Sequence, residues 1–195
     1  MLKTDVRHDI IVIGGSAGSI AALVQLAQGF PPDLPAAVFI VVHTSPNFPS
    51  LLPEILQNSG PLPAVHAEDG APIEPGRIYV APPDRHLLVK RECMRVVFGP
   101  KENRFRPAID PLFRTGAQAY GKRVVGIVLS GLLYDGTQGL IEIKERGGVV
   151  IVQDPQEAAV PCMPQNAIKH VAVDHILSIA DMAHVLSELS HELVQ

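Results

Sequence analysis

The chain has 195 residues, 47% of them hydrophobic, and a formal net charge of -4. This length supports one sizeable hydrophobic core, so we predict a single domain over residues 1–195. The small negative charge, without a basic arm or an acidic tail, argues against nucleic acid or an anionic membrane surface as a partner.

Targeting and metal-binding signals are lacking in the sequence. The N-terminus has no basic start followed by an apolar run and a cleavage site, and the longest apolar runs, at 10–13 and 36–42, are much shorter than the roughly 20 residues that span a bilayer. We therefore expect a cytoplasmic protein without direct membrane insertion. Cys93 and Cys162 lack C-x-x-C spacing and a nearby histidine cluster, so we predict neither a disulfide nor a metal site.

The first third of the chain alternates strand and helix patterns. Unbroken β-branched runs are typical of strands covered on both faces, and segments rich in Ala, Leu and Gln that stop at glycine are typical of helices. The predicted elements are a strand at residues 10–13, a helix at 17–28, a strand at 37–42 and a short helix at 51–57.

Residues 61–100 have a different pattern, because short alternating segments are separated by Pro and Gly pairs. We predict hairpins here, with strands at residues 77–80, 86–90 and 94–98.

The second half returns to alternating strands and helices. Asp110 followed by Pro111 predicts a helix start, with the aspartate as N-cap. The predicted elements are a helix at 110–120, a strand at 124–129, a helix ending near residue 146, a strand at 149–152 and a helix at 179–193. The whole order predicts an α/β fold: a doubly wound, mostly parallel sheet flanked by helices, with an antiparallel hairpin insertion.

Three polar residues fall where such a sheet binds its ligands, at the carboxyl ends of the strands. Ser16 follows the first strand, His43 ends the second, and Asp135 lies in the loop after the strand at 124–129. A hydroxyl, an imidazole and a carboxylate are the components of nucleophilic acyl transfer.

The turn at residues 14–18, Gly-Gly-Ser-Ala-Gly, fits the G-x-S-x-G nucleophile elbow, with the Ala17 N–H as the natural oxyanion donor. An equally strong interpretation is a phosphate-binding or merely tight turn at a helix N-terminus. The spacing does not match the G-x-G-x-x-G dinucleotide fingerprint, and the P-loop lysine is missing.

The other two residues also have ordinary interpretations. His43 alone is more typical of a packed strand end, and Asp135 before glycine is typical of a helix cap. The order Ser, His, Asp differs from that of the α/β-hydrolase fold, which indicates a different family.

Several motifs together resemble one family. They are residues 13–18 (IGGSAG, similar to I-G-A-S-T-G), His43 with its proline loop (Q-H-M-P), 81–86 (APPDRH, A-P-x-D-x-H), 104–110 (RFRPAID, R-x-R-P-S-V-D), 131–136 (GLLYDG, G-M-G-x-D-G) and 163–168 (MPQNAI, M-P-x-x-A-I). The sequence thus resembles, over nearly its whole length, the catalytic domain of chemotaxis protein-glutamate methylesterases of the CheB type.

The resemblance implies a reaction. Ser16 attacks the ester carbonyl of a methylated glutamate, His43 transfers the proton and Asp135 orients the imidazole, without a cofactor. The implied substrate and partner is the cytoplasmic part of a methyl-accepting chemoreceptor, and the same chemistry on an amide deamidates glutamine. The family's usual N-terminal receiver domain fits no part of this sequence, so a stand-alone catalytic domain is expected.

The sequence departs from the family pattern beside the implied oxyanion site. Ala17 replaces threonine, Ser19 replaces glycine, and Leu132 and Leu133 replace Met-Gly. Backbone donors survive side-chain changes, but leucine avoids backbone angles that glycine reaches, so the loop conformation and substrate preference are open. The alternative is a non-catalytic or altered-specificity docking module of the same fold.

Arg104 and Arg106 have two interpretations. They either pair locally with acidic side chains, which is the slightly stronger interpretation, or line the cleft to meet acidic receptor helices.

Overall fold

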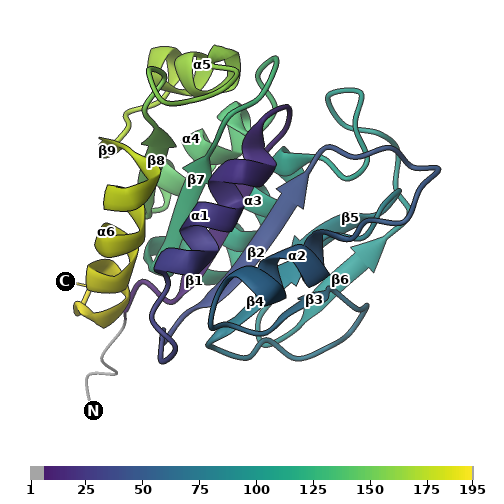
Figure 1. Cartoon of the computed structure of the whole chain (residues 1–195), viewed down its shortest axis with the longest axis horizontal. Coiled ribbons are helices and arrows are strands. Elements are labelled where there is room, and N and C mark those ends of the chain that lie inside the picture. Colours follow the sequence, from purple (N-terminus) through teal and green to yellow (C-terminus); the bar gives the residue numbers. More distant parts are fainter. Residues whose placement is uncertain (1–6, 195) are drawn as a thin grey trace.

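The structure, a computed structural model, describes residues 7–194 and is built on a parallel β-sheet flanked by helices (Figure 1). Within these residues the sheet has seven strands in the order β3-β4-β2-β1-β7-β8-β9, and each neighbouring pair is parallel. The strands are β1 (Ile10–Gly15), β2 (Ala37–Val42), β3 (Ala64–His66), β4 (Arg77–Val80), β7 (Val124–Val128), β8 (Val149–Gln153) and β9 (His175–Leu177). A separate antiparallel hairpin is formed by β5 (His86–Val89) and β6 (Met94–Val97).

Helices cover both faces of the sheet. They are α1 (Ser19–Gly29), α2 (Leu52–Ser59), α3 (Ile109–Tyr120), the 3-10 turn η1 (Gly121–Arg123), α4 (Thr137–Glu145), α5 (Cys162–His170) and α6 (Ile179–His191). The helices α1, α2 and α6 pack on one face, while α3, α4, α5 and the hairpin lie on the other. No helix formed by residues 7–194 has the length and hydrophobicity needed to cross a membrane.

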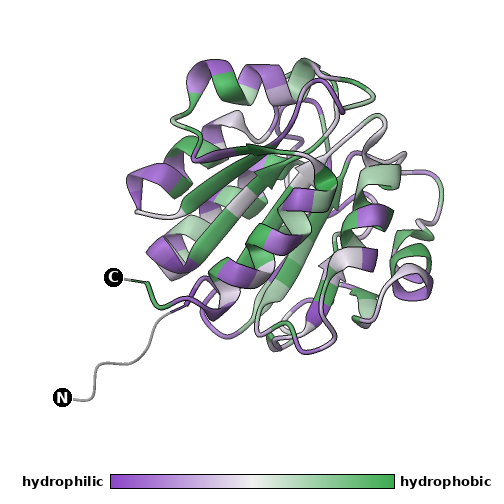
Figure 2. Ribbon diagram, turned by 60° about the vertical axis from the view of Figure 1, so that its left-hand side comes forward, coloured by the Kyte–Doolittle hydropathy of each residue, from purple (hydrophilic) through white to green (hydrophobic). Residues whose placement is uncertain are grey.

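The alternation of side chains along β1 explains why its sequence is apolar throughout. Ile11 and Ile13 contribute to the core beneath α1 and α6, whereas Ile10 and Val12 contribute to the core beneath α3 and α4. Because successive side chains of a strand point to opposite faces, a strand covered on both sides needs apolar residues at every position. Figure 2 shows this arrangement, with hydrophobic strands enclosed by helices whose outer sides are hydrophilic. The predicted α/β class is confirmed.

Two parts of the prediction were wrong or incomplete. Arg77–Val80 is not a hairpin strand but β4, which pairs in parallel with β2 and β3. Ile78 and Tyr79 are buried on opposite faces of the sheet, so β4 is covered on both sides like the other strands of the main sheet. The strands β3 and β9 and the helix α5 were not predicted from the sequence. The strands β3 and β9 have only three residues each, which is too short for an alternation to be recognised.

Candidate active site

Ser16, His43 and Asp135 lie together, because β2, β1 and β7 are neighbours in the sheet and each residue follows the carboxyl end of one of them. The Nδ1 atom of His43 is 3.1 Å from the Ser16 Oγ atom, and its Nε2 atom is 2.7 Å from Oδ2 of Asp135. Hydroxyl, imidazole and carboxylate therefore form one continuous hydrogen-bonded line. The His43 side chain is 4% exposed and that of Asp135 is 1% exposed, so this line is shielded from water except at its serine end.

The turn that carries Ser16 is held by backbone contacts. The Ser16 N–H donates to the carbonyl of Ser130 at 3.0 Å, and Ser19 donates to the Ser16 carbonyl through both its N–H and its hydroxyl. Gly18 adopts a φ of 79°, and a Cβ atom there would approach Ala159 Cβ to 2.7 Å. Glycine at this position therefore allows both the left-handed turn and the close contact.

Asp135 is the most heavily bonded group of the site. Its Oδ2 atom accepts from His43 and from the Ile109 N–H at 2.7 Å, and its Oδ1 atom accepts from Asn103 Nδ2 at 2.7 Å and the Asp110 N–H at 3.1 Å. Burial alone would raise the pKa of Asp135, but the hydrogen bonds from His43, Ile109 and Asn103 outweigh burial and hold this pKa below its usual value. Asp135 is thus an ionised carboxylate facing the imidazole.

Asp110 supplies a second carboxyl group beside Asp135, and its predicted role as the N-cap of a helix was wrong. It is not the N-cap of α3, which begins at Ile109; instead its Oδ1 atom accepts the Gly139 N–H of α4 at 2.7 Å. Asn103 Nδ2 donates to the Oδ2 atom of Asp110, also at 2.7 Å, and so bridges the two carboxyl groups. Burial, with the negative charge of Asp135, raises the pKa of Asp110 to about 6.

This raised pKa predicts a pH-dependent stability. Because folded Asp110 binds its proton more tightly than the unfolded chain does, its contribution to the free energy of unfolding falls by about 3 kcal/mol in total as pH rises from below about 4 to above about 6. Urea unfolding of the native chain and of Asp110→Asn across this range measures the effect, since the other groups largely cancel in the difference. The exposed Asp33→Asn is the control. A native-to-variant difference that stays constant over the range would contradict the prediction.

Phe105 is a site residue that the sequence analysis did not single out. Its ring stacks on the imidazole of His43, with centroids 3.5 Å apart and planes inclined by 5°. The stack fixes the plane of the imidazole, so that its two nitrogens point toward Ser16 and Asp135. No local pattern marks this role, because the two residues are distant in sequence.

The loop after β7 passes directly over Ser16. A Cβ atom on Gly131 would lie 2.9 Å from Ser16 Cβ, and the side chains that follow, Leu132 and Leu133, are 54% and 40% exposed. Leu133 has a φ of 67°, so this leucine keeps a left-handed conformation that glycine adopts more easily. Within residues 7–194 the N–H groups of Ala17 and Leu132 donate to no other group, which leaves them available to an oxyanion.

The two arginines considered as substrate contacts differ in environment. Arg106 pairs with Asp84 at 2.7 Å, donates to the carbonyl of Gly99 and lies over the ring of Phe98. Arg104 is exposed and lines a small pocket of about 70 Å³ with residues that include Asp135. Arg106 is therefore occupied by an acidic partner in the fold, whereas Arg104 lies at the rim of the site.

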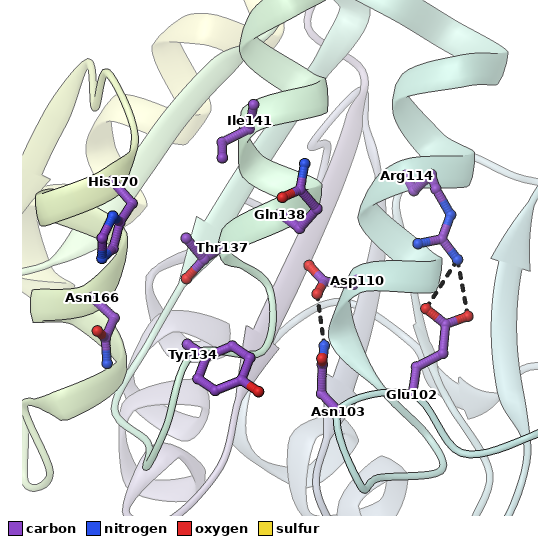
Figure 3. Close-up of a pocket in the computed structure, with 10 residues that line it drawn as sticks. All are labelled: Glu102, Asn103, Asp110, Arg114, Tyr134, Thr137, Gln138, Ile141, Asn166 and His170. Atoms are coloured by element: carbon purple, nitrogen blue, oxygen red, sulfur yellow. Dashed lines mark hydrogen bonds and ion pairs between the residues drawn. The ribbon is translucent and has the colours of Figure 1, made fainter.

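A larger cavity of about 610 Å³ lies next to this site but contains neither Ser16 nor His43 (Figure 3). Its lining residues are Glu102, Asn103, Asp110, Arg114, Tyr134, Thr137, Gln138, Ile141, Asn166 and His170. Glu102 and Arg114 pair with each other at 2.9 Å across one wall. Among the described residues, no group of three or more His, Cys, Asp or Glu side chains is arranged to hold a metal ion.

Known proteins with similar sequences identify the family of the chain. The CheB methylesterase family model matches residues 11–186. A relative from Anaeromyxobacter dehalogenans, named protein-glutamate methylesterase/protein-glutamine glutaminase 2, is 36% identical over 94% of this chain and 54% of its own. A relative from Leptospira interrogans, named putative protein-glutamate methylesterase/protein-glutamine glutaminase, is 35% identical over 94% of this chain and 95% of its own.

A solved structure agrees with these relatives. The crystal structure of the Thermotoga maritima CheB methylesterase catalytic domain superposes with a TM-score of 0.89 at 31% identity, covering 93% of this chain and 98% of that one. The chain spans about half the length of the Anaeromyxobacter relative (54%) and nearly all of the Leptospira relative (95%). The chain therefore belongs to the CheB methylesterase family.

Proposed function

We propose that the chain is a serine hydrolase that demethylates glutamyl methyl esters on chemoreceptors in chemotaxis-like signalling, and that the same site deamidates receptor glutamines. The observation that carries this proposal is the hydrogen-bonded line from Ser16 through His43 to Asp135. The names of the relatives, which give both methylesterase and glutaminase activities, support the substrate class. The cytoplasmic part of a receptor is the proposed partner, and the cytoplasm the proposed location.

The proposed reaction begins with His43 as the general base. The ionised Asp135 accepts a hydrogen bond from Nε2, which favours the tautomer with its proton on Nε2 and a free lone pair on Nδ1. Nδ1 then takes the Ser16 proton as Oγ attacks the ester carbonyl. The resulting oxyanion accepts hydrogen bonds from the free N–H groups of Ala17 and Leu132.

The second half of the reaction restores the enzyme. His43 returns its proton to the leaving methoxide, methanol departs, and an ester links the glutamyl carbonyl to Ser16. Water then attacks this ester while His43 again takes a proton, and collapse of the intermediate releases the glutamate side chain and free Ser16. With glutamine as substrate the leaving group is ammonia, and the later steps are the same.

The exposed apolar residues near the site suit docking of a receptor helix. Phe48 and Leu51 lie in the loop that follows β2, while Leu132 and Tyr134 lie in the loop that follows β7. These two loops also carry His43 and Asp135, so a helix seated on them brings its side chains to Ser16. Arg104 is the proposed contact for acidic receptor residues, whereas Arg106 is already paired with Asp84.

The test is methanol release from a fully methylated chemoreceptor cytoplasmic fragment incubated with the native chain. We expect release to accompany a loss of methyl groups at receptor glutamates, and a receptor carrying glutamine at these positions to release ammonia. Mass spectrometry of receptor peptides assigns each reaction to its site. Lack of methanol and ammonia release from several receptor fragments, with a folded chain, would refute the proposal and favour the docking module.

A further inference from the structure

The loop over Ser16 is held in a conformation that its sequence does not favour. Leu133 has a φ of 67°, in the left-handed region where an L side chain crowds the following carbonyl. Such a conformation persists in leucine only when neighbouring groups hold it. The neighbours that hold this loop are therefore part of how the site is built.

One anchor of the loop is a side chain of α5. Asn166 Nδ2 donates to the Leu133 carbonyl at 2.9 Å and to the Cys162 carbonyl, one turn earlier in α5, at 3.0 Å. A side-chain amide has two N–H groups, so both bonds form at once. The second bond fixes the rotamer of Asn166, and the first transmits this fixed position to Leu133.

Two further anchors of the loop are backbone groups from the same region of the chain. The Gly131 N–H donates to the Val160 carbonyl at 3.0 Å, and the Met163 N–H donates to the Gly131 carbonyl at 2.8 Å. The segment from Val160 to Asn166 thus holds the loop on both sides of Leu132. Of these three bonds, only the one from Asn166 depends on a side chain. The Cys162 Sγ atom also lies 3.9 Å from the Leu133 carbonyl oxygen, which makes it a weaker contact than the Asn166 bond at 2.9 Å.

We propose that Asn166 is a positioning residue, which keeps Leu133 left-handed and so holds in place the loop that carries the Leu132 N–H over Ser16. This inference rests on the proposed hydrolase reaction. Without the bond to its carbonyl, Leu133 relaxes toward negative φ, and the loop on either side of it shifts, which moves the Leu132 N–H away from Ser16. The oxyanion then loses a donor, which weakens binding of the transition state more than binding of the ester.

A double-mutant cycle tests the role of Asn166. We expect Asn166→Ala to lower kcat for methanol release about five- to tenfold with little change in KM, since one hydrogen bond that positions a transition-state donor is lost. In a Leu133→Gly background, Asn166→Ala should lower kcat less than about twofold relative to that background, because glycine adopts a positive φ without an anchor. A purely structural role of Asn166 would not depend on the residue at position 133.

The matched control is Gln165→Ala, on the exposed side of the same helix turn, which should leave kcat unchanged. Alanine is the best helix former, so both alanine variants should keep α5 intact. Equal kcat losses from Asn166→Ala in the two backgrounds, or no loss in the native background, would overturn the inference.

A measurement that does not depend on activity tests whether Asn166 anchors the loop, independently of whether the chain carries out the proposed reaction. Amide hydrogen exchange at residues 131–135 should be faster in Asn166→Ala than in Gln165→Ala if Asn166 anchors the loop. Equal exchange in the two variants would refute the anchor whatever the activity. An inactive native chain that shows the expected exchange difference would instead refute the hydrolase reaction, and with it the role of Asn166 in catalysis.

Discussion

Ser16→Ala is expected to lower kcat for methanol release by about three orders of magnitude or more, because the variant has no nucleophile to form the acyl-enzyme ester. The fold should remain intact. The Ser16 side chain bonds to His43, whereas the turn is held by its N–H and its carbonyl, which alanine retains. Methanol release and thermal unfolding, measured on the same preparations, distinguish a lost nucleophile from a lost fold.

Ser187→Ala is the matched control for this experiment, since Ser187 lies on α6, away from the loops that carry the site. It should release methanol at the native rate. A serine-reactive phosphonate should label the native chain and the Ser187 variant at Ser16, and should not label the Ser16 variant. Methanol release by Ser16→Ala within about tenfold of native would exclude Ser16 as the nucleophile.

Asp135→Asn is expected to lower kcat by about three to four orders of magnitude. The neutral amide no longer selects the tautomer of His43 with its proton on Nε2, so Nδ1 is no longer free to accept the Ser16 proton. The loss should fall mainly on kcat, because the Asp135 side chain is only 1% exposed and contacts His43 rather than the open face of the site. Steady-state methanol release at several receptor concentrations separates kcat from KM.

The same variant should also change the titration of Asp110. Removing the negative charge of Asp135 favours ionisation of its neighbour, so the pKa of Asp110 should fall below about 6. Carboxyl NMR of Asp110 in the native chain and in Asp135→Asn measures this shift, and Asp33→Asn is the control for a distant carboxylate. An unchanged pKa of Asp110 would show that the two carboxyl groups are not coupled.

The fold class and the positions of Ser16, His43 and Asp135 could be predicted because each rests on a local pattern. Apolar runs of strand length, each followed by a polar residue, place those residues at one edge of a parallel sheet without any knowledge of distant contacts. The strands β3 and β9 could not be predicted, because three residues are too few to show the alternation of apolar and polar side chains that marks a strand. Their places in the sheet come from pairing with the longer strands β4 and β8. Arg77–Val80 was assigned to a hairpin because the alternation of side chains along a strand does not reveal which other strand it pairs with.

The parts of the site that the sequence analysis missed arise from contacts between segments far apart in the chain. Phe105 stacks on His43, and Asn103 bridges Asp110 and Asp135, although no spacing rule connects these residues. The effect of Leu133 also depends on tertiary structure, because its backbone angle is maintained by Asn166 rather than by its own preference. Local sequence therefore indicates the candidate reacting groups, while the surrounding fold determines how they are held.

The hydrogen bonds of Asp135 have a consequence for how this family can change over evolution. The carboxylate accepts the backbone N–H groups of Ile109 and Asp110, so it ties the start of α3 to the loop after β7 as well as facing His43. Among residues 7–194, the Ser16 side chain bonds only to His43 and so holds no backbone segment in place. In a lineage that loses the proposed reaction and keeps the fold, we expect the serine to be replaced early and the aspartate to be retained, because only the aspartate also stabilises the fold. An aspartate at this position is thus weak evidence of an active relative, and a serine at position 16 is much stronger evidence.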